Sequence, residues 1–222
     1  MKFERLFTYR FQLFFYSLIT ILFGSLIFPK HILADVIMPL LFVINITSGL
    51  VIFKKQKRQT WLVRGLIFLV VSVFFYRYFS NSEDRVLDYI RFLVYFVFYA
   101  LITFEIITQV WNAKRVNRTV IYGLMSGYIA LGLIGFFIFN CIELISPNSF
   151  SGLIEGGLTP ENIESLMYYS YITLMTIGYG DITPLTDVAQ KATMFLALSG
   201  QFYLVIITAV VVEKYIRHSQ KD

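Results

Sequence analysis

The residues with the densest chemical signal in this chain are 176–181, which read Thr-Ile-Gly-Tyr-Gly-Asp. Gly178 and Gly180 alternate with larger residues, and glycine adopts backbone dihedrals that L-residues resist. Such dihedrals can turn successive backbone carbonyls toward one axis, where their oxygens replace the water around a dehydrated cation. Thr176 can add a hydroxyl at one end of the segment. The pattern therefore predicts a cation site built mainly from the main chain.

The elements around this segment must position it. Residues 161–175 predict a helix too short to span a bilayer. Glu161 and Glu164 are expected in its first turn, where carboxylates suit the positive end of a helix. Long apolar runs at 119–144 and 188–212 lie on either side. This order predicts a re-entrant helix and loop between two membrane spans.

The whole chain has the composition of a membrane protein. Hydrophobic residues make up 57% of it and charged residues 15%, whereas soluble domains are about half apolar and a quarter charged. We expect an all-α membrane protein with six transmembrane helices and a re-entrant pore helix and loop between helices 5 and 6. The six predicted spans are residues 11–28, 36–53, 61–80, 86–111, 119–144 and 188–212.

The charges predict how these spans are oriented. With the N-terminus in the cytoplasm, most of the 19 Lys and Arg residues lie inside and most of the 14 Asp and Glu residues lie outside. We therefore expect a multi-pass plasma membrane protein with both termini cytoplasmic. The basic run 54–58 is mainly a topology signal and could also hold anionic lipid headgroups. Because the basic residues are confined to short loops, no nucleic-acid partner is expected.

Residues 167–184 resemble the pore loop of tetrameric potassium channels, whose filters read Thr-Val-Gly-Tyr-Gly. Here Ile177 replaces the valine. The resemblance extends more loosely over about residues 119 to 214, and the first four spans resemble six-helix channels in number and order only. It implies a K⁺-selective channel subunit that works as a homotetramer, since one chain supplies one filter loop, and that needs no cofactor. By the same resemblance the ion-facing carbonyls belong to Thr176, Ile177, Gly178 and Tyr179, and Gly180 completes the filter.

Three further positions near the filter follow from this resemblance. Tyr168 and Tyr169 occupy the places of aromatic residues that surround the filter, and Tyr168 could hydrogen-bond Asp181 behind it. The alternative is that both tyrosines only pack. Ile172 stands where some relatives have a glutamate that pairs with the aspartate, so that pair is absent here.

The last span should line the inner pore. Gly200 matches the gating-hinge glycine of the family, with close packing against the pore helix as an equal alternative. Leu204 and Thr208, one and two turns on, are expected to line the cavity. The fifth span carries glycines that are expected to pack against the last span. These glycines are Gly123, Gly127, Gly132 and Gly135.

The sequence predicts two domains: a four-helix sensor-like domain at 1–112 and a pore domain at 113–222. A voltage sensor needs several regularly spaced arginines, but the fourth span has only Arg85 and Arg91, both near its outer end. We therefore expect no strong voltage gating. Ten residues follow Val212 in this sequence, so gating is expected to come from the membrane domain, lipid, tension, pH or a separate partner.

Two other functions compete with a channel. A potassium transporter packs four degenerate filter repeats into a longer chain, and a silent or regulatory subunit needs a partner subunit. A membrane enzyme is disfavoured, because the two histidines, His31 and His218, lie in a loop and a tail and the spans hold no catalytic or metal-binding cluster.

Overall fold

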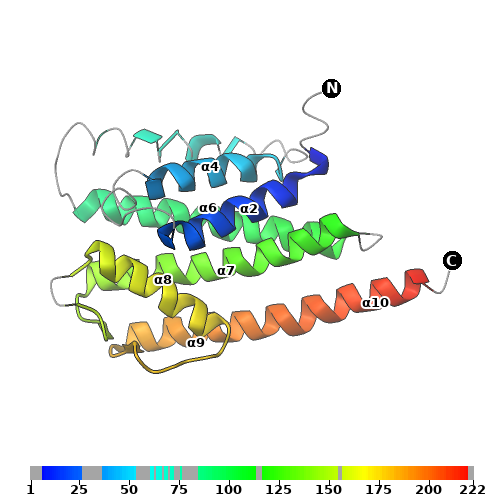
Figure 1. Ribbon diagram of the computed structural model, residues 1–222. Coiled ribbons are helices and arrows are strands. Elements are labelled where there is room, and N and C mark those ends of the chain that lie inside the picture. The colour runs from blue at the N-terminus through cyan, green and yellow to red at the C-terminus, as the bar shows by residue number, and fades with distance from the viewer. Residues whose placement is uncertain are drawn as a thin grey trace. The chain divides into compact units, whose positions relative to one another are not determined.

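The computed structural model describes residues 7–26, 37–53, 61–62, 64–66, 68–69, 71–72, 76, 85–113, 117–154 and 157–219. The described chain is mostly helical (Figure 1), as expected for an all-α membrane protein. Its helices are α2 (Arg10–Phe23), the 3₁₀ turn η1 (Gly24–Leu26), α4 (Met38–Leu50), α6 (Arg85–Trp111), α7 (Arg118–Ile145), α8 (Pro160–Leu174), α9 (Asp187–Phe202), the π-helical turn η3 (Tyr203–Ile207) and α10 (Thr208–Ser219). Two short strands, β1 (Phe150–Ser151) and β2 (Thr183–Pro184), pair antiparallel.

Three described stretches are long and apolar enough to cross a membrane: Val86–Trp111, Arg118–Ile145 and Asp187–Lys214. They coincide with the predicted spans 86–111, 119–144 and 188–212 to within two residues at each end.

The first two predicted spans correspond to shorter apolar helices, because α2 ends at Phe23 and its apolar neighbour runs over Leu40–Leu50. The third, 61–80, is described only at separate positions, each of them helical. The basic run 54–58 lies outside the described residues.

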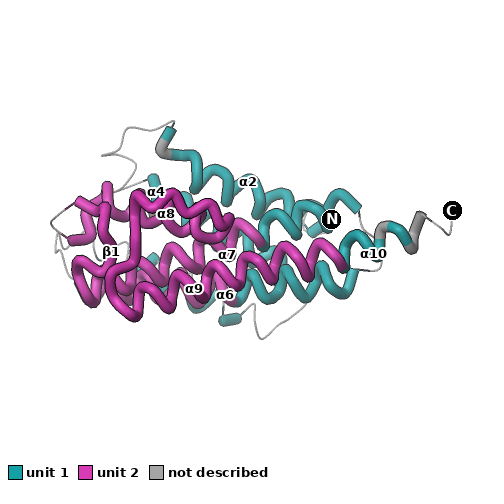
Figure 2. Tube along the Cα trace, turned by 90° about the horizontal axis from the view of Figure 1, so that it is seen from below, with its two compact units in different colours: residues 1–83, 101–127, 210–222 teal, residues 84–100, 128–209 magenta. Residues whose placement is uncertain are grey.

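The chain divides into two compact units, shown in Figure 2. Unit 1 comprises residues 1–83, 101–127 and 210–222, and unit 2 comprises 84–100 and 128–209. In unit 1, α2 and α4 pack together around buried apolar side chains and a polar pair, in which Asn45 Nδ2 donates to Ser17 Oγ at 2.8 Å. A Cβ added at Gly123 would meet the Phe11 ring at 3.2 Å. Gly123 therefore packs against the first helix, and its predicted packing against the last span was wrong.

The half-buried amide of Gln109 organises the other end of unit 1. Gln109 accepts a hydrogen bond from Arg10 Nε at 3.1 Å and donates to Glu105 at 2.7 Å and to the carbonyl of Ile52 at 2.9 Å. Glu105 is only 3% exposed. The Gln109 side chain thus gives hydrogen-bond partners to Arg10, Glu105 and the carbonyl of Ile52. Polar groups that are buried in a protein require such partners.

In unit 2 the short helix α8 packs against α7 and α9. Two side chains of α8 donate to backbone carbonyls of α7: Tyr171 to Ile129 at 2.7 Å, and Ser170 to Gly132 at 2.6 Å. A Cβ at Gly132 would collide with the Tyr171 ring, and one at Gly135 would collide with Leu196 of α9. Glycine thus lets these helices approach closely. Gly135 meets the last span as predicted, whereas Gly132 meets α8.

Candidate functional site

The helix before the filter begins at a well-formed cap. Thr159 accepts a hydrogen bond from the backbone N–H of Asn162 at 3.2 Å, and Pro160 occupies the first turn, where its missing N–H is not needed. The buried Asn162 side chain also donates to the carbonyls of Ile154 and Gly157 at 2.7 and 2.5 Å. These contacts tie the start of α8 to the loop before it.

The observed helix, Pro160–Leu174, starts and ends one residue before the predicted 161–175. Glu161 lies in its first turn as expected. Glu164 falls one position beyond that turn, because the helix begins earlier.

The backbone of the filter segment alternates in handedness. Thr176, Gly178 and Gly180 have φ values of +58°, +57° and +84°, while Ile177 and Tyr179 between them do not have positive φ. A regular strand sends successive carbonyls to opposite sides, whereas alternation of left- and right-handed residues turns them to the same side. Thr176 adopts a left-handed conformation, which costs an L-residue roughly 1–2 kcal/mol.

Hydrogen bonds fix the start of this segment to α8. The N–H of Ile177 donates to the carbonyl of Ile172 at 2.8 Å, and that of Thr176 donates to Thr173 at 3.0 Å. Gln201 of α9 donates its side-chain amide to Thr176 Oγ1 at 3.4 Å. Sequence reasoning missed Gln201, although a polar side chain within an apolar span is the signal that could have identified it.

The two tyrosines of the pore helix have different surroundings. Tyr169 is buried, bonds Thr193 Oγ1 at 2.9 Å and packs on the ring of Phe139 at 5.1 Å. The half-exposed Tyr168 instead makes a side-chain hydrogen bond with Asp181, which raises the pKa of the Tyr168 phenol. The structure therefore brings Tyr168 and Asp181 together and places Tyr169 in the packing between helices.

Gly200 of α9 lies close to the end of α8. A Cβ there would lie 2.6 Å from the carbonyl oxygen of Leu174 and 2.7 Å from its Cδ1 atom. Of the two alternatives for Gly200, this geometry favours close packing. The π-helical turn η3 follows at Tyr203–Ile207, and the expected cavity-lining residues Leu204 and Thr208 are exposed.

The filter and the inner helix leave apolar surface uncovered in a single chain. Every residue from 175 to 181 is exposed, including Ile177 (46%) and Tyr179 (72%). In the apolar window of Asp187–Lys214 only 22% of residues are buried, against 61% in Arg118–Ile145. Such a face needs lipid or another protein surface against it.

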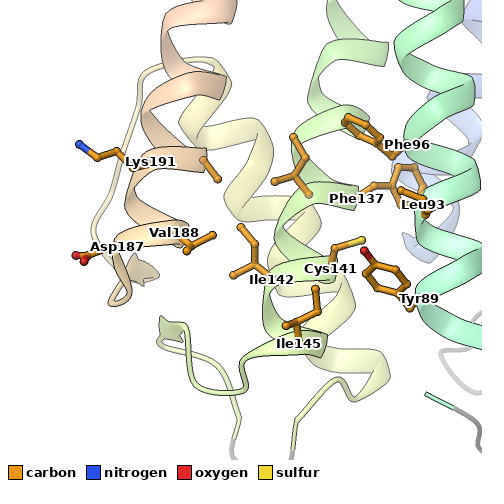
Figure 3. Close-up of a pocket in the computed structure, with 12 residues that line it drawn as sticks. Tyr89, Leu93, Phe96, Phe137, Cys141, Ile142, Ile145, Asp187, Val188 and Lys191 are labelled. Carbon is orange, nitrogen blue, oxygen red and sulfur yellow. The ribbon is translucent and has the colours of Figure 1, made fainter. Parts of the chain in front are cut away.

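A separate apolar cavity of about 580 Å³ lies among α6, α7 and α9 (Figure 3). Leu93, Phe137, Cys141 and Val188 are among its lining residues, and no filter residue is. Asp187 and Lys191 point away from Cys141 in this view. The cavity offers no cluster of polar groups for chemistry.

Residues 123–217 match the Ion_trans_2 family model, which is described as an ion channel. No curated protein and no solved structure matches the chain. The matched stretch runs from α7 through the pore helix and the filter segment into α10. The match supports an ion channel, and it indicates that the protein is a channel and not an enzyme.

Proposed function

We propose that this chain is one subunit of a homotetrameric, K⁺-selective channel whose filter is residues 176–180. The observation that carries the proposal is the alternating sign of φ along the filter segment, directly after the end of a short buried helix. Alternation lets consecutive carbonyls face a common axis, and rings of carbonyls replace the hydration shell of K⁺.

The pore helix adds to the attraction for a cation. Its C-terminal end precedes the filter at Leu174, and a helix C-terminus carries a partial negative charge of about half an elementary charge. Tyr128 donates to the carbonyl of Leu174 at 3.3 Å, which fixes this end of the helix to α7. The end of α8 is therefore rigidly held where a permeating cation benefits from it.

The exposed filter side chains support four copies rather than one. A single loop cannot surround an ion, and Ile177 and Tyr179 lack a packed environment in one chain. Neighbouring subunits around a four-fold axis would cover these side chains and the apolar face of α9. The assembly lies in the plasma membrane, with both termini in the cytoplasm and lipid around it.

Opening of this pore depends little on voltage. In the fourth predicted span Arg91 pairs with Asp88 of the same helix at 3.0 Å, so its charge is locally balanced. Arg85 and Arg91 cannot supply the several gating charges that steep voltage dependence requires.

Purified protein in liposomes tests the proposal. We expect K⁺ flux that greatly exceeds Na⁺ flux, little change of open probability with voltage, and a particle with the mass of four chains. Equal K⁺ and Na⁺ flux would overturn the selectivity. Uptake that depends on a second ion gradient favours the transporter, and flux that appears only with a partner subunit favours the regulatory subunit.

A further inference from the structure

The loop between α7 and α8 returns to the far end of the filter segment. We call residues 146–154 of this loop the β1 loop. In it Phe150 pairs with Pro184 and Ser151 pairs with Thr183, in an antiparallel register. The hydroxyls of Ser151 and Thr183 lie 2.6 Å apart, close enough for a hydrogen bond. The β1 loop is therefore joined to residues 183–184, three and four positions after Gly180.

The next residue of the β1 loop makes the closest approach. Gly152 has a φ of +82°, and a Cβ there would collide with the carbonyl oxygen of Asp181 and lie 3.1 Å from its carbonyl carbon. The obstacle is main chain rather than the flexible end of a side chain, so it cannot move without moving the backbone. Asp181 adjoins Gly180, the last filter residue. Gly152 thus limits where the exit of the filter can lie.

The β1 loop is itself firmly anchored. The buried carboxylate of Glu143, at the end of α7, accepts hydrogen bonds from the backbone N–H groups of Asn148 and Ser149 at 2.7 and 3.0 Å. The Phe150 ring packs edge-on against Tyr169 of the pore helix at 5.5 Å. Two helices therefore hold the strand that reaches the filter, so it can act as a fixed support.

This support stands where the carboxyl group that some relatives place on the short helix is absent. Ile172 of the pore helix has no carboxyl group with which to hold Asp181, and the Tyr168 hydrogen bond reaches Asp181 through a half-exposed side chain. The contact at Gly152 acts on the backbone of Asp181, which connects directly to the carbonyls of the filter.

We propose that the β1 loop is a backbone clamp on the outer end of the filter, with Gly152 as its positioning residue. The clamp keeps residues 176–180 in the conducting conformation by fixing the carbonyl of Asp181. This inference rests on the proposed function of that segment as a K⁺ filter.

Gly152→Ala and Gly157→Ala together test the clamp. Both place alanine at a positive φ, but only the first brings a methyl group against the backbone of Asp181. Gly152 and Gly157 have φ values of +82° and +85°, but a Cβ at Gly157 meets nothing within 4 Å. In Gly152→Ala the new methyl group displaces the Asp181 backbone, whereas Gly157→Ala only strains its own loop. We expect K⁺ current through Gly152→Ala to decline about tenfold faster during sustained opening, with a lower K⁺ to Na⁺ permeability ratio. Gly157→Ala should behave as the unmodified channel.

Raising external K⁺ separates a positioning role from a folding defect. K⁺ binds only the ordered filter, so it favours that conformation by mass action. We expect added K⁺ to slow the decline in Gly152→Ala, while a general folding defect would not respond. Ser151→Ala and Thr183→Val provide milder variants if Gly152→Ala does not assemble, and each should speed the decline by a smaller factor.

One result would overturn the clamp in a channel that selects K⁺. In that result Gly152→Ala has the same permeability ratio and rate of current decline as Gly157→Ala. The same holds if Ser151→Ala and Thr183→Val both match Gly157→Ala. If the unmodified channel does not select K⁺, the proposed function fails instead. The two failures are thus told apart by the unmodified protein alone.

Discussion

The filter segment and the helices behind it use glycine for opposite reasons. Gly178 and Gly180 have left-handed φ values, and a Cβ at either would meet nothing within 4 Å in one chain. Gly135 and Gly200 have no positive φ, but a Cβ at Gly135 would lie 2.7 Å from Ser170 Oγ, and one at Gly200 would lie 2.6 Å from the Leu174 carbonyl. Glycine is needed for backbone conformation in the first region and for close approach in the second.

The two regions therefore have different roles: one adopts the unusual backbone conformation and the other holds it in place. Thr176 beside these glycines holds a strained left-handed conformation, and such strain persists only where the surroundings enforce it. The helical region supplies that enforcement, because α7 and α9 contact the pore helix as closely as glycine allows. Gly152 combines both features, with a positive φ and a close main-chain neighbour.

The largest effect should come from Gly178→Ala. An L-residue at a φ of +57° carries roughly 1–2 kcal/mol of strain, and a tetramer would carry it four times around one ion path. We expect the K⁺ to Na⁺ permeability ratio to fall at least about tenfold. Within one chain the loss of stability should not exceed this strain, because no neighbour lies within 4 Å of the new methyl group.

Gly157→Ala is the control for that experiment, since it introduces alanine at a φ of +85° outside the filter. Its permeability ratio should equal that of the unmodified channel. A Gly178→Ala channel that retains full selectivity would show that the left-handed backbone is not what the filter needs.

Gly200→Ala should have the largest effect on stability. The new methyl group would lie 2.6 Å from a backbone oxygen, and overpacking of this kind typically costs about 1–3 kcal/mol. A hinge without close neighbours would instead gain about 1 kcal/mol from the better helix propensity of alanine. Thermal unfolding of the purified protein distinguishes the two, because a lower midpoint supports packing and a higher midpoint supports the hinge.

A smaller loss of stability is expected for Gly135→Ala. Its new methyl group meets side chains, Leu196 and Ser170, which yield more easily than backbone, so we expect about 1–2 kcal/mol. Gly65, a helical residue with open space around it, is the matched control, and alanine there should stabilise the protein slightly. If both variants raise the unfolding midpoint, the close packing of α7 on the pore helix is wrong.

Local signals in the sequence predicted the position of α8 well. The helix at Pro160–Leu174 was located to within one residue, because a cap, a proline and an apolar run act within a few positions of one another. The positive φ values at Gly178 and Gly180 also follow from residue type. The proximity of Tyr168 to Asp181 was expected from the family resemblance, and Asp181 lies close enough to the phenol to raise its pKa.

Contacts between distant segments were not predictable in the same way. Gly152 meets Asp181, and Gln201 meets Thr176, but neither approach leaves a local pattern because each depends on how helices pack. Gly123 carried the same predicted packing against the last span as Gly135, yet it packs on Phe11. A glycine thus indicates that something lies close, and tertiary packing decides which segment that is.

Tyr168→Phe should have the smallest effect, because it removes one half-exposed hydrogen bond and leaves the Gly152 contact in place. We expect K⁺ current to decline only a few-fold faster, with an unchanged permeability ratio. The bond with Asp181 raises the pKa of the phenol, so the neutral phenol is the form that donates. Its contribution is therefore complete below the ordinary tyrosine pKa of about 10 and is lost as the pH rises through the raised value. The unmodified channel and the variant should thus differ by a constant factor near neutral pH and converge in strong alkali, and a difference that instead persisted there would show that the hydrogen bond is not its cause.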